Sequence, residues 1–346
     1  MTAAEVSTEP RQETPPAVRR RRSERVVGLL TGAFVGIGVL MVALRAIPEL
    51  QRHWFGPYVS AFIPYGILAW GAAFLLSLLL PARATRVLVV GCAAGLLLQA
   101  SWVAPLFVAD ERPPGGTAVT IASWNIRDLA VDPDVLTRRT SAADIVILLE
   151  FDRGTEAILG QGTARALQER GWQERYPHTV AGIPGPGAST VIYSRFPLEE
   201  VESLPSIHRQ FVVRVSPPSG PPFVLVAAHP LNPRAGSATW EREGTLLADA
   251  VARHSGGPLV VMGDLNGTTD QLTIRRLLAA APLRDAADEA GAGWLRTWPN
   301  HTVLDLPPLI ALDHAFVGGS AYADAVETLA AAGSDHRGLL LRLRVR

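Results

Sequence analysis

Two short polar segments of this 346-residue chain place carboxylate, amide and imidazole side chains beside apolar runs. Gly263-Asp264-Leu265-Asn266 follows residues 258–262, and Gly333-Ser334-Asp335-His336 precedes residues 339–345. Attack of water on a phosphate ester needs a carboxylate to polarise the water, an amide to orient it, a metal ligand, and an imidazole to steady phosphoryl charge. The two segments contain all of these groups, and they predict a metal-dependent phosphohydrolase.

Further polar residues stand at the ends of other apolar, strand-like runs. They are Asn125, Glu150, His229 and the Asp313-His314 pair. Each has an ordinary structural alternative when taken singly: Asp and Asn form turns with their own backbone, a strand-end Glu is solvated, and a core His is satisfied by neighbours. A carboxylate beside an imidazole also fixes its tautomer and raises its basicity, which suits a phosphate-binding histidine.

Three stretches near the N-terminus carry no charge: residues 26–44, 58–80 and 87–109, which are 19, 23 and 23 residues long. About 20 apolar residues cross a bilayer, so these stretches predict three transmembrane helices within residues 26–110. The alternative is a signal peptide followed by buried core helices. Residues 1–25 are polar and Arg-rich and predict a disordered cytoplasmic tail, and residues 111–116 predict a linker.

Arginine distribution predicts the orientation in the plasma membrane. Most of the arginines that flank the stretches precede the first one or lie between the second and third, which places the N-terminus in the cytoplasm. After three crossings, the domain at residues 117–346 would be extracytoplasmic. This prediction depends on an odd number of crossings. If one stretch enters and leaves the membrane on the same side, the domain would lie in the cytoplasm.

Charge and cysteine content narrow the class of function. The whole chain has 32 basic and 32 acidic residues, but from Gly115 onward there are 21 Arg and 25 acids, a net charge of −4. That balance argues against a protein that tracks long nucleic acid. The single cysteine, Cys92, lies in the third apolar stretch, so the later domain has neither a cysteine nucleophile nor a zinc–thiolate site.

Beyond the linker, apolar runs rich in β-formers alternate with helical stretches, which predicts a mixed α/β fold. The expected strands are residues 117–125, 145–150, 189–194, 210–215, 223–229, 259–263, 311–317 and 339–345. The expected helices are residues 133–141, 155–170, 239–254 and 271–280.

Taken in order, these motifs resemble the endonuclease/exonuclease/phosphatase family over essentially all of residues 117–346. The matching segments are Ser123-Trp124-Asn125-Ile126-Arg127, Leu149-Glu150, Tyr193-Ser194-Arg195-Phe196-Pro197, Ala228-His229-Pro230-Leu231-Asn232, Gly263–Asn266, Leu312-Asp313-His314 and Ser334–His336. The resemblance implies a deoxyribonuclease I-like four-layer α/β sandwich, with two mixed sheets packed together and helices outside.

The resemblance also implies roles. Glu150 and Asp335 would ligate Mg²⁺ or Mn²⁺ with Asn125 at or near the metal, and oxygen ligands suit such hard cations. Asp264 would polarise the attacking water, Asn266 would orient it, and His336 paired with Asp313 would stabilise the phosphoryl group. His229 and Asn232 would contact the phosphate from the other side, and Arg127 would reach the substrate or face solvent. His314 is expected to be structural.

The sequence departs from the family pattern at two places, and two alternatives for its function stay open. Leu149 stands where the family commonly has Gln, and residues 187–190 offer no acid to partner His229. The predicted function is a membrane-anchored phosphoesterase whose substrate is a lipid head group, a small phosphorylated molecule or nucleic acid. The alternative is a non-catalytic membrane sensor or scaffold that retains the fold. Besides the phosphate ester, the only partner expected is the lipid bilayer, through three helices; no protein partner can be inferred.

Overall fold

The structure is a computed structural model that describes residues 16–346 apart from 128–129, 152–162, 182–189 and 301–306. The chain forms two compact units. Met1–Val42 and Tyr65–Ser101 make the first, here the helical unit, and Ala43–Pro64 and Trp102–Arg346 make the second, here the α/β unit.

The described strands of the α/β unit form two six-stranded sheets. The first has the order β11-β12-β1-β2-β4-β3 and contains β1 (Thr117–Asn125), β2 (Ile145–Leu149), β3 (His178–Ala181), β4 (Val191–Ser194), β11 (Ala321–Leu329) and β12 (Gly338–Val345). The second has the order β5-β6-β7-β8-β10-β9 and contains β5 (Leu198–Ser203), β6 (Phe211–Val215), β7 (Phe223–Ala228), β8 (Leu259–Asp264), β9 (Leu283–Asp285) and β10 (Asp313–Gly318).

Both sheets are mixed in the same way. β1 and β2 pair in parallel in the first sheet, as do β7 and β8 in the second. The remaining described pairs are antiparallel. A parallel pair needs a crossover connection, and α9 (Ser237–Arg253) supplies it between β7 and β8.

Alternating side chains of the strands separate three apolar layers. The central layer lies between the sheets and holds Ile121 and Ile147 of the first sheet against Leu225 and Met262 of the second. Because successive strand residues face opposite sides, the intervening residues form two outer layers. One packs under α5, α7 and α8, and the other under α9 and α10.

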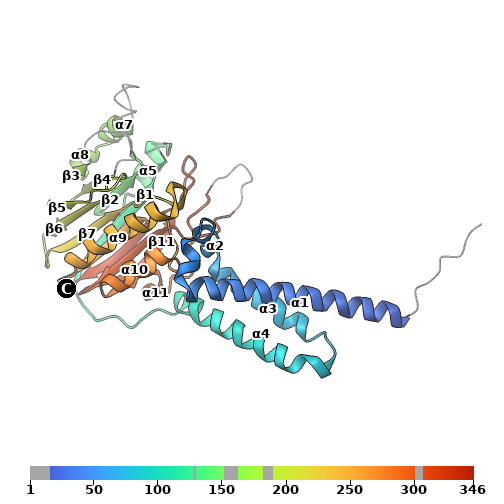
Figure 1. Ribbon diagram of the computed structural model, residues 1–346. Helices are drawn as coiled ribbons and strands as arrows, with labels where there is room; N and C mark the ends of the chain where they lie inside the picture. Colours follow the sequence, from blue (N-terminus) through green and yellow to red (C-terminus); the bar gives the residue numbers. More distant parts are fainter. Residues whose placement is uncertain (1–15, 128–129, 152–162, 182–189, 301–306) are drawn as a thin grey trace, which may run out of the picture. The chain divides into compact units, whose positions relative to one another are not determined.

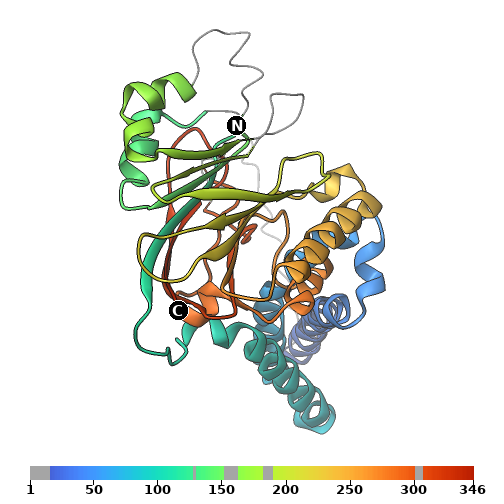
Figure 2. The ribbon, with the colours of Figure 1, turned by 90° about the vertical axis from the view of Figure 1, so that its left-hand side faces the viewer.

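The outer helices complete a four-layer sandwich, as expected from the resemblance (Figure 2). Their bounds are α5 (Pro133–Arg139), α7 (Thr163–Glu169), α8 (Trp172–Arg175), α9 and α10 (Leu272–Ala280). A further helix, α11 (Ala286–Ala290), adds Ala286 to the central layer. Local signals fix several of their ends. Asp132 caps α5 by accepting hydrogen bonds from the backbone N–H groups of Asp134 and Val135, and Asp285 caps α11 through the N–H of Ala287.

Sequence periodicity located the buried strands and the long helices, but it missed the edge strands. β5 is a polar, largely exposed edge strand, and β9 has only three residues, so neither shows the alternation of apolar and polar residues that marks a half-buried strand. The expected helix 155–170 is seen as α7 from Thr163 onward, and residues 155–162 lie outside the described part.

The helical unit contains most of α1 (Pro16–Ala46) and α4 (Ala82–Val103) and all of α3 (Gly66–Ser77) (Figure 1). Trp70 of α3 occupies the space beside Gly38 of α1 and Gly95 of α4. A Cβ at Gly38 or Gly95 would lie 2.5 or 2.4 Å from the indole ring. Small residues therefore let these three helices approach closely.

The structure corrects one expectation about this region and leaves another as a prediction. Among the described residues, two helices are long and apolar enough to cross a membrane, Arg20–Ala46 and Thr85–Phe107, while the middle apolar helix covers only Ile63–Ser77, so the third span stays a prediction. Residues 16–25 of the expected disordered tail belong to α1, where Arg20 and Glu24 form an i,i+4 ion pair. Residues 1–15 lie outside the described part.

Candidate active site

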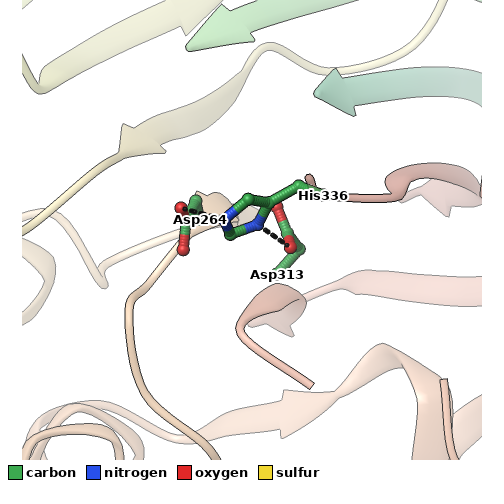
Figure 3. Close-up of side chains that lie close together, drawn as sticks. All are labelled: Asp264, Asp313 and His336. Carbon is green, nitrogen blue, oxygen red and sulfur yellow. Dashed lines mark hydrogen bonds and ion pairs between the residues drawn. The ribbon is translucent and has the colours of Figure 1, made fainter. Parts of the chain in front are cut away.

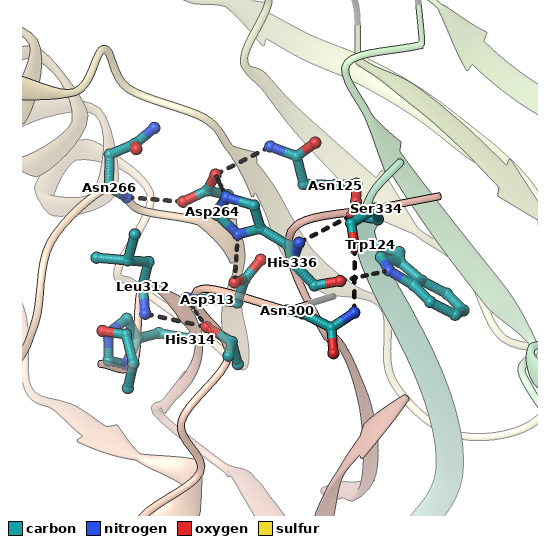
Figure 4. A network of polar contacts seen from close by, with 12 residues as sticks. Trp124, Asn125, Asp264, Asn266, Asn300, Leu312, Asp313, His314, Ser334 and His336 are labelled. Carbon is teal, nitrogen blue, oxygen red and sulfur yellow. Dashed lines mark hydrogen bonds and ion pairs between the residues drawn. The ribbon is translucent and has the colours of Figure 1, made fainter. Parts of the chain in front are cut away.

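Polar side chains from both sheets meet in one largely buried cluster, part of which is shown in Figure 4. Strand register explains the meeting. Parallel pairing of β1 and β2 aligns Asn125 with Leu149, next to Glu150, and antiparallel pairing of β8 and β10 aligns Asp264 with Asp313. The cluster consists of Asn125, Glu150, His229, Asp264, Asp313 and His336.

Asn125 joins the two sheets within the cluster. Its amide nitrogen donates to Oε1 of Glu150 at 2.9 Å and to Oδ2 of Asp264 at 3.0 Å. Its amide oxygen accepts the backbone N–H of Arg127 at 3.0 Å. Asn125 is thus a hydrogen-bond bridge between two acids. To ligate a metal it would have to turn its oxygen toward them, and that role stays a prediction.

His336 lies between two carboxylates (Figure 3). Its Nδ1 is 2.9 Å from Oδ2 of Asp313, and its Nε2 is 3.5 Å from Oδ2 of Asp264. Its backbone N–H donates to the hydroxyl of Ser334, and that hydroxyl donates to the carbonyl of Asn125. Two carboxylates therefore hold the ring and Ser334 holds its backbone, as the resemblance implies for a group that holds phosphoryl charge.

Burial and charge set the protonation of these groups. Burial raises the pKa of the Asp264 carboxyl to about 7, against the opposing effect of His336. Burial by itself would lower the pKa of His336, but Asp264 and Asp313 outweigh it and raise that pKa to about 10. His336 therefore carries a proton at neutral pH and presents a positive group inside an acidic cluster.

Backbone conformation is unusual at the same place. The non-glycine residues with positive φ in the described part are Arg127 (47°), Glu150 (53°) and Asn266 (48°), and all three belong to the predicted site. Left-handed backbone at such residues costs on the order of 1 kcal/mol each and persists where surrounding contacts impose it. Gly263 is required for space, because a Cβ there would lie 1.9 Å from the carbonyl oxygen of Ala228.

His229 is fully buried beside the acids, with Nε2 3.8 Å from Oδ2 of Asp264 and 3.9 Å from Oε1 of Glu150. Neither ring nitrogen has a hydrogen-bond partner among the described residues. Burial, followed by the charges of His208 and His336, lowers its pKa well below the usual range, so the ring is neutral. Polar atoms buried without partners cost free energy, and they mark a position that a ligand can satisfy.

The ring of His208 packs against that of His229, with centroids 4.0 Å apart and an angle of 34° between the planes. His208 could not be singled out from the sequence, because no acid stands beside it along the chain. Residues 187–189 of the segment that lacks an acid for His229 lie outside the described part.

The other expected site residues occupy different positions. Asp335 is half-exposed at the rim, where its carboxylate lies 3.9 Å from Nε of the exposed Arg127. Asn266 donates from its side chain to the carbonyl of Pro230 at 3.0 Å, and its own N–H donates to Asp264. Asn232 accepts the N–H of Arg234 and caps a short 3-10 helix, so its described contact lies in a turn outside the cluster.

His314 has a structural environment, as expected. Its Nε2 lies 2.9 Å from the carbonyl oxygen of Gly267 and 3.1 Å from that of Ala311, so this nitrogen donates to backbone. Burial lowers its pKa. Its contacts hold the chain that follows Asn266.

Two further buried residues hold the site in place, and no sequence motif points to them. The hydroxyl of Thr297 accepts the N–H groups of Leu312 and Asp313 at 3.1 and 3.2 Å. Asn300 donates from its side chain to the carbonyl oxygens of Ala331 and Ser334, just before the loop that carries His336. Both residues lie in a segment without a long element of its own, so neither periodicity nor a strand-end position points to them.

The donor set fits a divalent cation, which the resemblance implies. Ligand atoms of Asp264, Asp313 and His336 lie within 4.8 Å of one another. Nδ1 of His336 is already bonded to Asp313, however, and the oxygens of Glu150 and Asp264 converge on one amide nitrogen of Asn125. We therefore favour the side of the cluster nearer Glu150, because hard cations prefer carboxylate oxygens. The expected ligand pair of Glu150 and Asp335 stays a prediction.

Comparison with solved structures agrees with this fold. An endonuclease/exonuclease/phosphatase from Beutenbergia cavernae superposes with a TM-score of 0.50 at 21% identity, covering 66% of this chain and 72% of that one. The catalytic domain of human Nocturnin with a bound sulfate anion gives 0.50 at 17% identity, covering 68% and 100%. Likeness at these identities shows the shared fold.

A comparison with the curated proteins found no match to this chain. The sequence profile of the endonuclease/exonuclease/phosphatase family, in contrast, matches residues 122–336. That range runs from β1 to His336 and includes every residue of the polar cluster. With two mixed sheets between outer helices and this profile over more than half its length, the chain belongs to the endonuclease/exonuclease/phosphatase family.

Proposed function

We propose that this protein is a membrane-anchored, divalent-metal-dependent hydrolase of phosphate esters. One observation carries the proposal: the ends of strands from both sheets bring Asn125, Glu150, His229, Asp264, Asp313 and His336 into one largely buried cluster. Burying this many titratable groups together costs stability, and such costs persist where chemistry requires them.

The protein groups have distinct tasks in hydrolysis. Asp264 accepts the proton of the attacking water at its carboxylate, and burial holds its pKa at about 7, near the operating pH of a general base. His336, protonated and held by Asp313, donates to a phosphoryl oxygen where negative charge develops. His229 donates a hydrogen bond from a neutral ring. Glu150 would hold a Mg²⁺ or Mn²⁺ ion, which would supply Lewis acidity and charge neutralisation.

The proposed membrane anchoring rests on the two long apolar helices. The number of crossings follows from which segments must lie on the same side of the membrane. The segment Ala43–Pro64 folds in one compact unit with Trp102–Arg346, so both lie on the same side of any membrane. Residues 65–101 must therefore cross an even number of times. Since Thr85–Phe107 is long enough to cross, the shorter Ile63–Ser77 would cross as well, which supports three spans.

Arginine distribution then favours a cytoplasmic N-terminus and an extracytoplasmic α/β unit. The net charge of −4 beyond residue 115 favours a lipid head group or a small phosphate ester over long nucleic acid.

The test is a hydrolysis assay of the full chain in lipid nanodiscs, with panels of phosphodiesters and phosphomonoesters, including phospholipids and DNA. We expect turnover with Mg²⁺ or Mn²⁺ and none with excess chelator. Asp264→Asn should be inactive in the same preparation. If the wild-type chain stays inactive on every substrate and binds neither cation by calorimetry, the scaffold alternative replaces this proposal.

Two readouts separate the substrate classes. A lipid substrate makes the rate depend on its surface density in the nanodisc. A nucleic acid makes the apparent affinity fall steeply as salt rises, because counterions are released on binding.

A further inference from the structure

A segment far from the family domain in sequence is packed into the α/β unit. Residues 43–60, here the docking segment, contain the 3-10 helix Pro48–Arg52 and the helix α2 (Gly56–Ser60). They belong to the α/β unit, although residues 65–101 of the helical unit follow them in the chain. Their contacts fall on the start of α10, just after the catalytic loop that carries Asp264 and Asn266.

Gln51 is the centre of this packing and is fully buried. Its amide nitrogen donates to the carbonyl of Leu44 at 2.8 Å and to the carbonyl of Asp270 at 3.2 Å. Its amide oxygen accepts the N–H of Leu272 at 2.8 Å. Both donor positions and the acceptor oxygen are thus used, and two of the three partners, Asp270 and Leu272, lie about 220 residues further along the chain.

The bond to Leu272 supplies something that α10 lacks locally. Leu272 is the first residue of α10, and the preceding residue, Gln271, makes no capping hydrogen bond with its side chain. The first N–H groups of a helix need acceptors from outside the helix. Gln51 therefore caps α10 from a distant part of the sequence.

Further contacts surround this cap. Arg45 pairs with Asp270, Gln271 donates to the carbonyl of Pro57, Arg275 donates to the carbonyl of Arg45, and Nε of Arg52 lies 3.1 Å from Oε2 of Glu241 in α9. The turn before α2 fits closely, because a Cβ at Gly56 would lie 2.3 Å from the carbonyl oxygen of Leu50.

The cap is connected to the catalytic residues through a short, buried stretch of chain. Only seven residues separate Asp264 from Leu272, and of residues 264–271 all but Thr269 are buried. Within the stretch, the side chain of Gln271 accepts the N–H of Thr268 at 2.6 Å, and the carbonyl of Gly267 accepts His314. A shift at the start of α10 is therefore passed to Asn266 and Asp264.

We propose that the docking segment is part of the catalytic unit and that Gln51 is a positioning residue for the loop carrying Asp264 and Asn266. The inference rests on the proposed function where it concerns turnover, but the structural contact can be tested without it.

Hydrogen exchange of the full chain in detergent measures the contact directly. Gln51→Ala removes the acceptor of the Leu272 N–H, so amides in residues 264–272 should exchange at least tenfold faster, while those of β1 and β2 keep their wild-type rates. The matched control is Gln168→Ala, which removes an exposed glutamine of α7 and should change neither region. Unchanged exchange at residues 264–272 in Gln51→Ala would overturn the proposal.

Kinetics test the positioning role. Gln51→Ala should lower kcat about tenfold with KM within twofold of wild type, because small displacements of reacting groups slow the chemical step more than binding. Gln51→Glu keeps an acceptor for Leu272 but turns a second oxygen toward the carbonyls of Leu44 and Asp270. It should lose as much activity as Gln51→Ala. Wild-type kcat in both variants contradicts the positioning role.

A crosslink keeps the proposal testable if Gln51 variants fail to fold. With Cys92→Ala as background, Arg52→Cys and Glu241→Cys should react together with a short bifunctional thiol reagent in native membranes and leave no free thiol. Two thiols that each react singly would show that the docking segment is not bound. An inactive wild type would refute the proposed function, whereas the crosslink and exchange results would still decide whether the docking segment is in place.

Discussion

The two Asp-His dipeptides of this chain, 313–314 and 335–336, place their histidines in opposite surroundings. His314 is buried against backbone, and its Nε2 donates to two carbonyl oxygens. His336 is buried against side chains, with a carboxylate at each ring nitrogen. Burial lowers the pKa of His314, whereas Asp264 and Asp313 raise that of His336 to about 10 despite burial.

The neighbouring acids differ in the same way. Asp285 lies 4.0 Å from His314, and one of its oxygens accepts the N–H of Ala287 and so caps α11. Asp313, bonded to His336, retains an oxygen without a hydrogen-bond partner among the described residues, and His229, beside Asp264 and Glu150, retains two such nitrogens. Polar side-chain atoms that hydrogen-bond to the backbone stabilise a fold, while polar atoms without such partners in a cluster are suited to binding a ligand. The comparison therefore separates a histidine held by backbone from one that stands in a cluster able to bind a ligand.

The strongest test of the functional side is Asp264→Asn. It keeps an oxygen for the N–H of Asn266 but cannot accept a proton, so kcat should fall about 10³-fold. The amide group then faces the donors of Asn125 and His336, but burial no longer disfavours a charge, so the thermal unfolding temperature should change little. Steady-state kinetics beside thermal unfolding of the same sample measure both. Residual activity within tenfold of wild type would remove Asp264 from the role of base.

The next test is His336→Gln, which removes the positive group between Asp264 and Asp313. We expect kcat to fall about 10²-fold, since one charged donor to the phosphoryl group is lost. Stability should fall by about 3 kcal/mol, because two buried carboxylates lose their counterion. Denaturant unfolding and the hydrolysis assay give the two values. A loss of stability without loss of turnover would make His336 structural, like His314.

His314→Ala should give the opposite pattern. The carbonyl oxygens of Gly267 and Ala311 lose their donor, which should lower the free energy of unfolding by about 2 to 3 kcal/mol. Turnover measured well below the unfolding temperature should stay within about tenfold of wild type, as the residue acts only by supporting the loop. Turnover as low as that of His336→Gln would end the distinction between the two histidines.

The smallest effect concerns Asp285 and depends on pH. Burial raises its pKa in the folded state from 3.8 to about 6. Between these two pKa values the Asp285 carboxyl loses its proton in the unfolded chain but keeps it in the folded protein. The free energy of unfolding of the wild type therefore falls as pH rises, and this loss is complete above pH 6. Asp285→Asn lacks this loss but still caps α11. We expect the variant to gain about 2 kcal/mol over wild type between pH 4 and 7, measured by urea unfolding. An equal pH slope in both proteins contradicts the assignment.

Much of the candidate site could be predicted because its residues stand where apolar runs stop. Asp264 ends β8, Asn125 ends β1, and Glu150 follows β2, so periodicity alone places them at strand ends. The order of the motifs then identified the family that the sequence profile confirms. The resemblance, rather than the spacing, separated His314 from His336, because each Asp-His pair stands beside an apolar run.

The supporting residues could not be predicted in this way. Thr297, Asn300 and His208 act through contacts across 15 to 34 residues and lie outside the strong periodic segments. Edge strands such as β5 carry polar residues on exposed positions, so their pairing leaves little pattern in sequence.

Local sequence thus determined which residues are apolar, where strands and long helices run, and which polar groups stand at their ends, because these depend on periodicities of two and 3.6 residues. Tertiary structure alone decided that Asn125 joins the acids of two sheets, and that Gln51 caps α10 from about 220 residues away. Such contacts depend on how whole sheets and helices pack in space, so the spacing of residues along the chain does not predict them.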